Sequence, residues 1–138
     1  MDIERLIQAA LLARDKAYVP YSHYSVGAAI MTDSGEIIDG CNIENASYGG
    51  TNCAERTAVF KAVSEGKRAF RAIAIAGGKE KEEPVTYAYP CGICRQVLNE
   101  FVREPSEFYV IVAKSTTDYR QFTLSELLPA GFGGDELQ

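Results

Sequence analysis

The spacing of apolar residues predicts that the chain begins with a helix and continues with a β-hairpin. Residues 1–18 carry apolar side chains at helical intervals, which would place them on one face of a helix. These side chains are Ile3, Leu6, Ile7, Ala10 and Leu11. After a loop, residues 26–42 contain Asp-Ser-Gly between two apolar stretches, a sequence typical of a hairpin turn.

The pattern of the next part of the chain alternates helices with short strands. We expect a helix from about residue 53 to residue 65, ending near Gly66, and another that begins within residues 90–94. Residues 70–78 and 107–113 are short apolar runs that favour buried strands. Strands separated by helices are typical of a sheet that helices cover.

The C-terminal part completes the predicted order of elements. A short helix is expected where Thr123 and Glu126 have the spacing of a capping box. The order is then helix, strand, strand, helix, strand, helix, strand, helix, which predicts an α/β fold with one mixed sheet. A chain of 138 residues has the length of one domain, so we assign residues 1–138 to a single domain.

Composition and charge argue against several classes of partner. The 14 lysines and arginines are scattered and the net charge is -5, so the basic stripe typical of nucleic-acid binding is missing. No apolar run approaches the ~20 residues that span a membrane. The first residues lack the basic head and apolar core of a secretory signal, and we therefore expect a cytoplasmic protein.

The cysteines are the candidate chemistry of the chain. Because thiols stay reduced in the cytoplasm, metal binding or catalysis is favoured over disulfides. Cys91 and Cys94 are three residues apart and follow Pro90 at the start of an expected helix. Cys53 also lies at a helix start. If the two starts meet, three thiolates converge and leave one tetrahedral position for water, as in catalytic zinc sites.

Glu55 has two interpretations. Asn52 is a good N-cap residue and would place Glu55 at the third helical position, the spacing of a capping box. Alternatively, Glu55 lies beside Cys53 and is the base that a zinc-activated water needs. The catalytic interpretation is favoured, because Cys-x-Glu together with a later Pro-Cys-x-x-Cys matches the zinc deaminase signature.

The sequence resembles the short-chain, homotetrameric cytidine deaminases over nearly its whole length. The segments that carry the resemblance are YSHYSVGAA, GCNIENASYG, NCAERTAVFKAVSEG, PCGICRQVLNEF and ELLPAGFG, in that order. The resemblance implies a three-layer α-β-α sandwich with a mixed five-stranded sheet. It also implies zinc-dependent hydrolysis of cytidine and deoxycytidine to uridine and deoxyuridine, with release of ammonia, in pyrimidine salvage. A nucleoside carries no phosphate, which agrees with the missing basic patch.

The resemblance further implies the metal site. One Zn²⁺ per chain would be held by three ligands: Cys53, Cys91 and Cys94. Glu55 would carry the proton between water and substrate. Arg56 would donate hydrogen bonds to thiolate sulfur and draw off part of the charge of three thiolates, and Gln96 would also support the site.

The same resemblance assigns contacts to the nucleoside. Asn42 and Glu44 would hold the ribose 3′-hydroxyl, for which an amide and a carboxylate are suited. Tyr24 occupies a position where the family commonly has phenylalanine, and its ring would stack on the pyrimidine. A core position is the alternative for Tyr24. The backbone around Ala54 would bind the base.

A homotetramer is implied as well, with sites that neighbouring subunits complete. Tyr48 and Phe132 match the positions that family members contribute across subunit boundaries, although simple packing is an alternative for both. Cys41 is interpreted as a buried free thiol and His23 as a polar loop residue.

Three other functions stay open. An enzyme of the same fold would act on another aminopyrimidine nucleoside such as blasticidin S, but the segment NIENASYG, residues 42–49, favours cytidine. In a non-catalytic zinc module, Cys41 would close a four-cysteine site. Thiol-disulfide exchange by Cys91 and Cys94 would need no metal.

Overall fold

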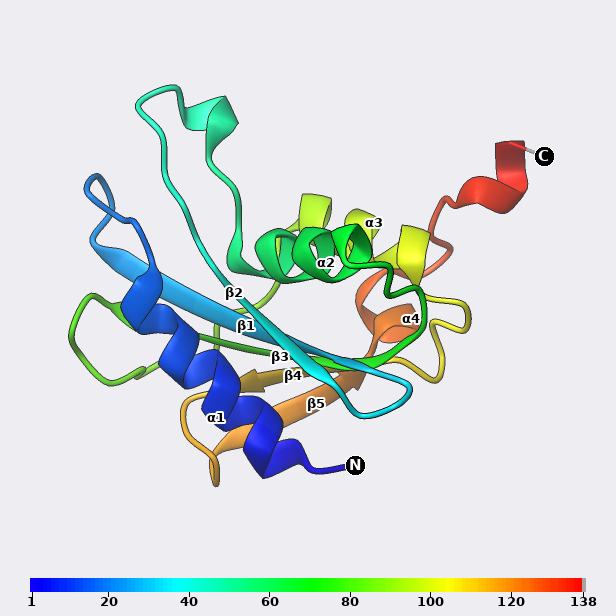
Figure 1. Ribbon diagram of the computed structural model, residues 1–138, viewed down its shortest axis with the longest axis horizontal. Coiled ribbons are helices and arrows are strands. Elements are labelled where there is room, and N and C mark those ends of the chain that lie inside the picture. The colour runs from blue at the N-terminus through cyan, green and yellow to red at the C-terminus, as the bar shows by residue number, and fades with distance from the viewer. Residues whose placement is uncertain (138) are drawn as a thin grey trace.

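One mixed sheet of five strands organises the fold (Figure 1). The structure is a computed structural model and describes residues 1–137. The strands are β1 (Tyr24–Thr32), β2 (Ile37–Cys41), β3 (Phe70–Lys79), β4 (Tyr109–Ala113) and β5 (Tyr119–Thr123). Their order in the sheet is β2-β1-β3-β4-β5, in which β3 and β4 are parallel and the other neighbours antiparallel. The expected mixed five-stranded sheet is confirmed.

Helices cover both faces of this sheet (Figure 1). They are α1 (Ile3–Ala13), α2 (Ala54–Ser64), α3 (Gly92–Phe101) and α4 (Leu124–Leu127). Helix α1 packs on one face, while apolar residues of α2, α3 and α4 share a core cluster with the other. The expected α-β-α layering is therefore confirmed, and none of the helices within residues 1–137 is long and apolar enough to cross a membrane.

The two faces of the sheet differ in the size of their side chains. Successive residues of a strand point to opposite faces, so isoleucines and alanines of β1 and β3 separate. The cluster under α2 and α3 includes Ile30, Ile73 and Ile75, and the cluster under α1 includes Ala29, Ala72, Ala74 and Ala76. The small face lets α1 approach the sheet closely: a Cβ on Gly27 would lie 1.9 Å from the carbonyl oxygen of Ala10.

The predicted hairpin and the predicted end of α2 near Gly66 are confirmed, but one strand was missed. β1 and β2 pair antiparallel across a turn in which Gly35 has a φ of 91°. Thr123 and Glu126 form the expected capping box. β5 was not predicted from the apolar pattern, because its first three residues are exposed and polar or aromatic, as befits the edge of a sheet.

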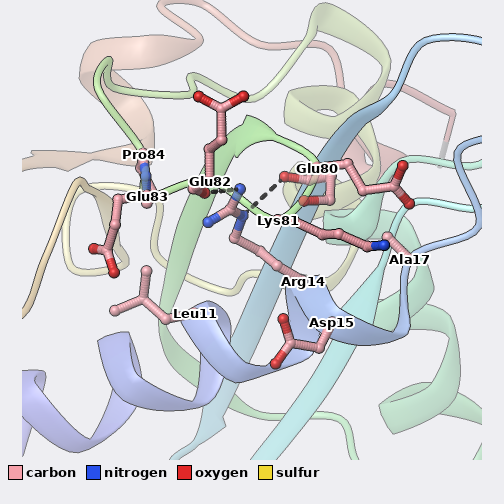
Figure 2. Close-up of a pocket in the computed structure, with 10 residues that line it drawn as sticks. Leu11, Arg14, Asp15, Ala17, Glu80, Lys81, Glu82, Glu83 and Pro84 are labelled. Carbon is pink, nitrogen blue, oxygen red and sulfur yellow. Dashed lines mark hydrogen bonds between the residues drawn. The ribbon is translucent and has the colours of Figure 1, made fainter.

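A hollow of about 460 Å³ lies between the end of α1 and the loop after β3. Arg14 reaches across it, as Figure 2 shows. Its Nε donates to the carbonyl of Ser25 at 3.0 Å, and its Nη2 donates to the carbonyls of Lys79 at 3.1 Å and Glu82 at 2.9 Å. Arg14 thus joins α1, β1 and the loop that leads toward α3. Four of the ten residues that line the hollow are acidic: Asp15, Glu80, Glu82 and Glu83.

Candidate metal centre and active site

Helices α2 and α3 begin at the same corner of the fold, and each begins at a cysteine. Cys53 is the N-cap residue of α2 and Cys91 is the N-cap residue of α3. Cys94 lies one turn further along α3 and is fully buried. The positive ends of two helices therefore point toward this corner, where they favour ionised thiols.

The three sulfur atoms are close enough to share one metal ion. Cys91 Sγ lies 3.5 Å from Cys94 Sγ and 3.9 Å from Cys53 Sγ, and all three lie within 4.8 Å of one another. Tetrahedral thiolates bound to zinc at about 2.3 Å would be about 3.8 Å apart, so the spacing fits. Within residues 1–137 this is the only such cluster, and Cys41 on β2 does not belong to it. A closed four-cysteine site is therefore not formed.

Glu55 is buried beside the cluster. Its residue is 4% exposed, and this burial raises the pKa of its carboxyl to about 7, with a smaller contribution from the neighbouring Cys53 thiol. The capping-box interpretation was wrong, because Cys53 and not Asn52 is the N-cap, and Glu55 is the second helical residue. The amide of Asn52 instead donates to the hydroxyl of Thr57 at 3.1 Å.

Arg56 contacts the cluster as expected. Its Nη2 donates to Cys53 Sγ at 3.2 Å. Hydrogen bonds from Cys94 and then from Arg56 lower the pKa of Cys53 to about 5, and the same contact with Cys53 raises the pKa of Arg56. Arg56 Nε is buried without a hydrogen-bond partner among residues 1–137. A cation against a sulfur stabilises a set of thiolates that would otherwise repel one another.

Asn42 and Glu44, the two residues expected at the ribose, are held by hydrogen bonds to backbone groups in β1 and just before it. Asn42 accepts from the amide of Val26 and donates to the carbonyl of Tyr24, both at 2.9 Å. Glu44 accepts from the amide of Ser22 and that of Tyr21, both at 3.1 Å, and from the Ser22 hydroxyl. Backbone contacts such as those from Tyr21 and Ser22 carry no signal in the sequence, so these two partners of Glu44 were not predicted.

An open hollow of about 360 Å³ lies beside Glu44, on the loop that leads to Cys53. It is lined by Tyr21, Ser22, Glu44, Tyr48 and Thr51. The rings of Tyr21 and Tyr48 meet edge to face with centroids 6.2 Å apart. The hollow therefore offers an aromatic wall and a carboxylate, which suits a sugar or a flat ring.

The other residues expected to contact the nucleoside lie on β1, on α2 and in the C-terminal segment. Tyr24 is half-buried at the start of β1, and a Cβ on Gly77 would lie 3.0 Å from its ring atom Cε1. Ala54 is buried as the first residue of α2. Phe132 is 55% exposed, and the hydrogen bond of Gln96 goes to the carbonyl of Phe132 at 2.8 Å.

Three thiols at two helix starts, with a buried carboxyl beside them, define a zinc centre of the hydrolytic type. Residues 1–111 match the family described as the cytidine and deoxycytidylate deaminase zinc-binding region. The chain is 47% identical over 137 residues to a cytidine deaminase of Sporosarcina psychrophila, covering 99% of this chain and 96% of that protein. It is similar to a crystal structure of cytidine deaminase from Burkholderia pseudomallei, with 46% identity, a TM-score of 0.85 and coverage of 96% and 100%.

A relative of different specificity is also similar. The chain is 32% identical over 131 residues to a blasticidin-S deaminase of Bacillus cereus, covering 93% of this chain and 89% of that protein. The identity to the cytidine deaminase of Sporosarcina psychrophila is higher and covers more of the chain. The chain belongs to the cytidine deaminase family, and with it to the zinc-dependent hydrolases.

Proposed function

We propose that the protein hydrolyses cytidine and deoxycytidine to uridine and deoxyuridine and releases ammonia. The observation that carries the proposal is the buried carboxyl of Glu55 beside three converging thiols at one corner. Because these thiols must stay reduced, we place the enzyme in the cytoplasm.

Cys53, Cys91 and Cys94 would hold the zinc ion. Zinc bound there would supply a Lewis acid that lowers the pKa of a water molecule. The chain contributes the electrostatic balance of this set. Two helix starts and the guanidinium of Arg56 offset the negative charge of three thiolates.

Glu55 is the proposed proton carrier. With a pKa of about 7, its carboxyl is able both to accept and to return a proton near neutral pH. Glu55 would take a proton from the attacking water and deliver it to N3 of the pyrimidine as the oxygen adds to C4. A second proton transfer to the exocyclic amine lets ammonia leave, so that cytidine plus water gives uridine plus ammonia.

The nucleoside would lie along the loop between β2 and α2. Asn42 and Glu44 retain free acceptor or donor capacity beyond their bonds to the backbone and would bind the ribose hydroxyls. Tyr24 would stack on the base, and the first amides of α2 around Ala54 would fix its polar edge.

We also propose a homotetramer in which neighbours complete each site. Tyr48 and Phe132 are 77% and 55% exposed, although both are large aromatic residues on ordered backbone. Light scattering of the purified protein tests this: a mass near four times 15.1 kDa is expected, and a monomer that retains full activity would overturn it.

The deciding experiment follows the loss of ultraviolet absorbance of cytidine and counts zinc on the same sample. About one zinc per chain with turnover supports the proposal. Zinc without any change in cytidine overturns it. Because of the similarity to blasticidin-S deaminase, blasticidin S is the second substrate to test, and a higher kcat/KM on it than on cytidine would reassign the enzyme.

A further inference from the structure

Two side-chain amides of α3 converge on a single carbonyl of the C-terminal segment. Gln96 Nε2 donates to the carbonyl oxygen of Phe132 at 2.8 Å, and Asn99 Nδ2 donates to the same oxygen at 3.0 Å. Residues three apart lie next to one another on a helix surface, so both amides face the segment together. One carbonyl oxygen has two lone pairs and accepts both bonds.

A third residue of α3 holds the beginning of the same segment. Arg95 Nη1 donates to the carbonyl of Leu127 at 2.8 Å, and its Nε donates to the carbonyl of Pro90 at 2.8 Å. Pro90 directly precedes Cys91. The segment 127–132 is therefore fixed at both ends to the helix whose start carries two of the three thiols.

The backbone of this segment is shaped to lie directly on α3. A Cβ on Gly131 would lie 2.9 Å from Leu128 Cδ2 and 3.3 Å from Asn99 Nδ2. Ala130 has a φ of 53°, a left-handed conformation that residues with a Cβ rarely adopt without support. The surrounding hydrogen bonds hold this conformation in place.

The backbone of Phe132 is fixed by hydrogen bonds, whereas its side chain is largely exposed. The carbonyl is bonded twice, while the residue is 55% exposed. Fixing the backbone of an exposed aromatic residue removes conformational entropy in advance, which strengthens any contact that the ring makes.

We infer that Gln96 and Asn99 are positioning residues that hold Phe132 ready to contact the nucleoside site of a neighbouring subunit. The inference rests on the proposed contribution of Phe132 to that site. It gives Gln96 a different task from the support of the zinc site that the sequence indicated. Both amides are uncharged, so this positioning does not depend on pH.

The test is a cycle of variants with the zinc-loaded enzyme. Gln96→Met together with Asn99→Leu removes both donors at similar volume, and Phe132→Ala removes the ring. Each change is expected to raise KM for cytidine by about tenfold, with a smaller effect on kcat. If the amides act through Phe132, adding the double substitution to Phe132→Ala produces no further rise in KM. Gln96→Lys, used in place of Gln96→Met, keeps a donor of similar reach and is expected to preserve most of the affinity for cytidine.

Two further measurements make the result unambiguous. Hydrogen exchange of amides 128–134 is expected to become faster in the double variant, while zinc content stays unchanged. Gln8→Met on the exposed surface of α1 is the matched control and should alter none of these quantities. Additive effects on KM, unchanged exchange, or a loss of zinc in the double variant would each overturn the inference. Hydrogen exchange is measured without substrate and therefore tests the positioning by Gln96 and Asn99 independently of activity. If the parent enzyme does not convert cytidine, that result overturns the proposed function alone.

Discussion

Two arginines lie at the ends of helices in this protein. One contacts only backbone carbonyls, and the other contacts a cysteine sulfur of the candidate metal centre. Arg14 closes the end of α1 and donates to three neutral carbonyls beside a hollow of about 460 Å³. Arg56 lies at the start of α2 and donates to the sulfur of Cys53. The first arrangement fixes a loop, whereas the second lowers the pKa of the Cys53 thiol.

The comparison shows that the size of a hollow is a poor guide to function here. Around Arg14 the acidic side chains are exposed to water. At the cysteine corner, burial raises the pKa of Glu55 to about 7 while hydrogen bonds lower the pKa of Cys53 to about 5. Groups whose environments move their pKa values in opposite directions mark a site of proton transfer.

The largest effect is expected from Glu55→Gln. The amide keeps the shape of the side chain but does not carry a proton, so kcat should fall by about 10⁴-fold, the upper range for a positioned acid-base group. Zinc content should remain near that of the parent enzyme. Steady-state assays on cytidine with metal analysis check both quantities, and turnover within tenfold of the parent would remove Glu55 from the mechanism.

The same variant makes a prediction about stability. The pKa of Glu55 is raised from its usual 4.5 to about 7, so the folded protein holds a proton that the unfolded chain releases. Folding stability of the metal-free protein therefore declines as pH rises from about 4.5 to about 7. Glu55→Gln removes this decline and should stabilise the metal-free protein by roughly 3 kcal/mol at pH 8. Urea unfolding of the parent and the variant at pH 4.5 and pH 8 measures this gain in stability. The same difference in unfolding free energy at both pH values would contradict the prediction.

Arg56→Gln and Arg14→Gln compare the two arginines directly. Loss of the cation from the sulfur is expected to weaken zinc binding by about 10–100-fold, as for other groups that orient metal ligands. Competition with a chelator measures the affinity. Arg14→Gln should leave zinc affinity and kcat unchanged, since its partners are carbonyls. A comparable loss of zinc affinity in both variants would mean that the two regions act as one.

Arg14→Gln is instead expected to reduce stability. It removes three hydrogen bonds and leaves the carbonyls of Lys79 and Glu82 to water, so the free energy of unfolding should fall by about 1–3 kcal/mol. Chemical denaturation provides the value. Gln8→Met is the matched surface control on α1, and a cost no larger than that of this control would show that the loop is held by other contacts.

The sequence allowed more of the site to be predicted than of its surroundings. Cys53, Cys91 and Cys94 lie in short motifs at helix starts, where local spacing determines what the side chains face. β5 could not be recognised, because an edge strand needs no apolar run. The partner of Gln96 could not be recognised either, since it depends on how a segment more than thirty residues later folds back onto α3.

The smallest effect concerns Asp39 of β2, which pairs with the last turn of α2 and with a lysine just after α1. Its carboxylate accepts from Lys61 of α2 at 2.7 Å and from Lys16, just beyond Arg14, at 3.5 Å. The hydrogen bond from Lys61 is the main cause that lowers the pKa of Asp39, and Lys16 adds to it, while the nearby Cys41 thiol has its own pKa raised chiefly by burial. Asp39 therefore contributes stability above its usual pKa of 3.8, and this contribution is lost as pH falls through the lower folded value.

Asp39→Asn should accordingly cost less than about 1 kcal/mol at pH 7, because both lysines are largely exposed to water. The difference from the parent should shrink as pH falls below 3.8, where the unfolded chain takes up a proton first, and should vanish below the lower pKa of the folded state. Lys61→Met should reproduce more of the cost than Lys16→Met, in line with the two distances. Denaturation curves at several pH values test this order of stability costs. The kcat of Asp39→Asn should equal that of the parent, because the end of α1 and the cysteine corner are expected to act independently. A changed kcat would mean that the two regions are coupled through this carboxylate.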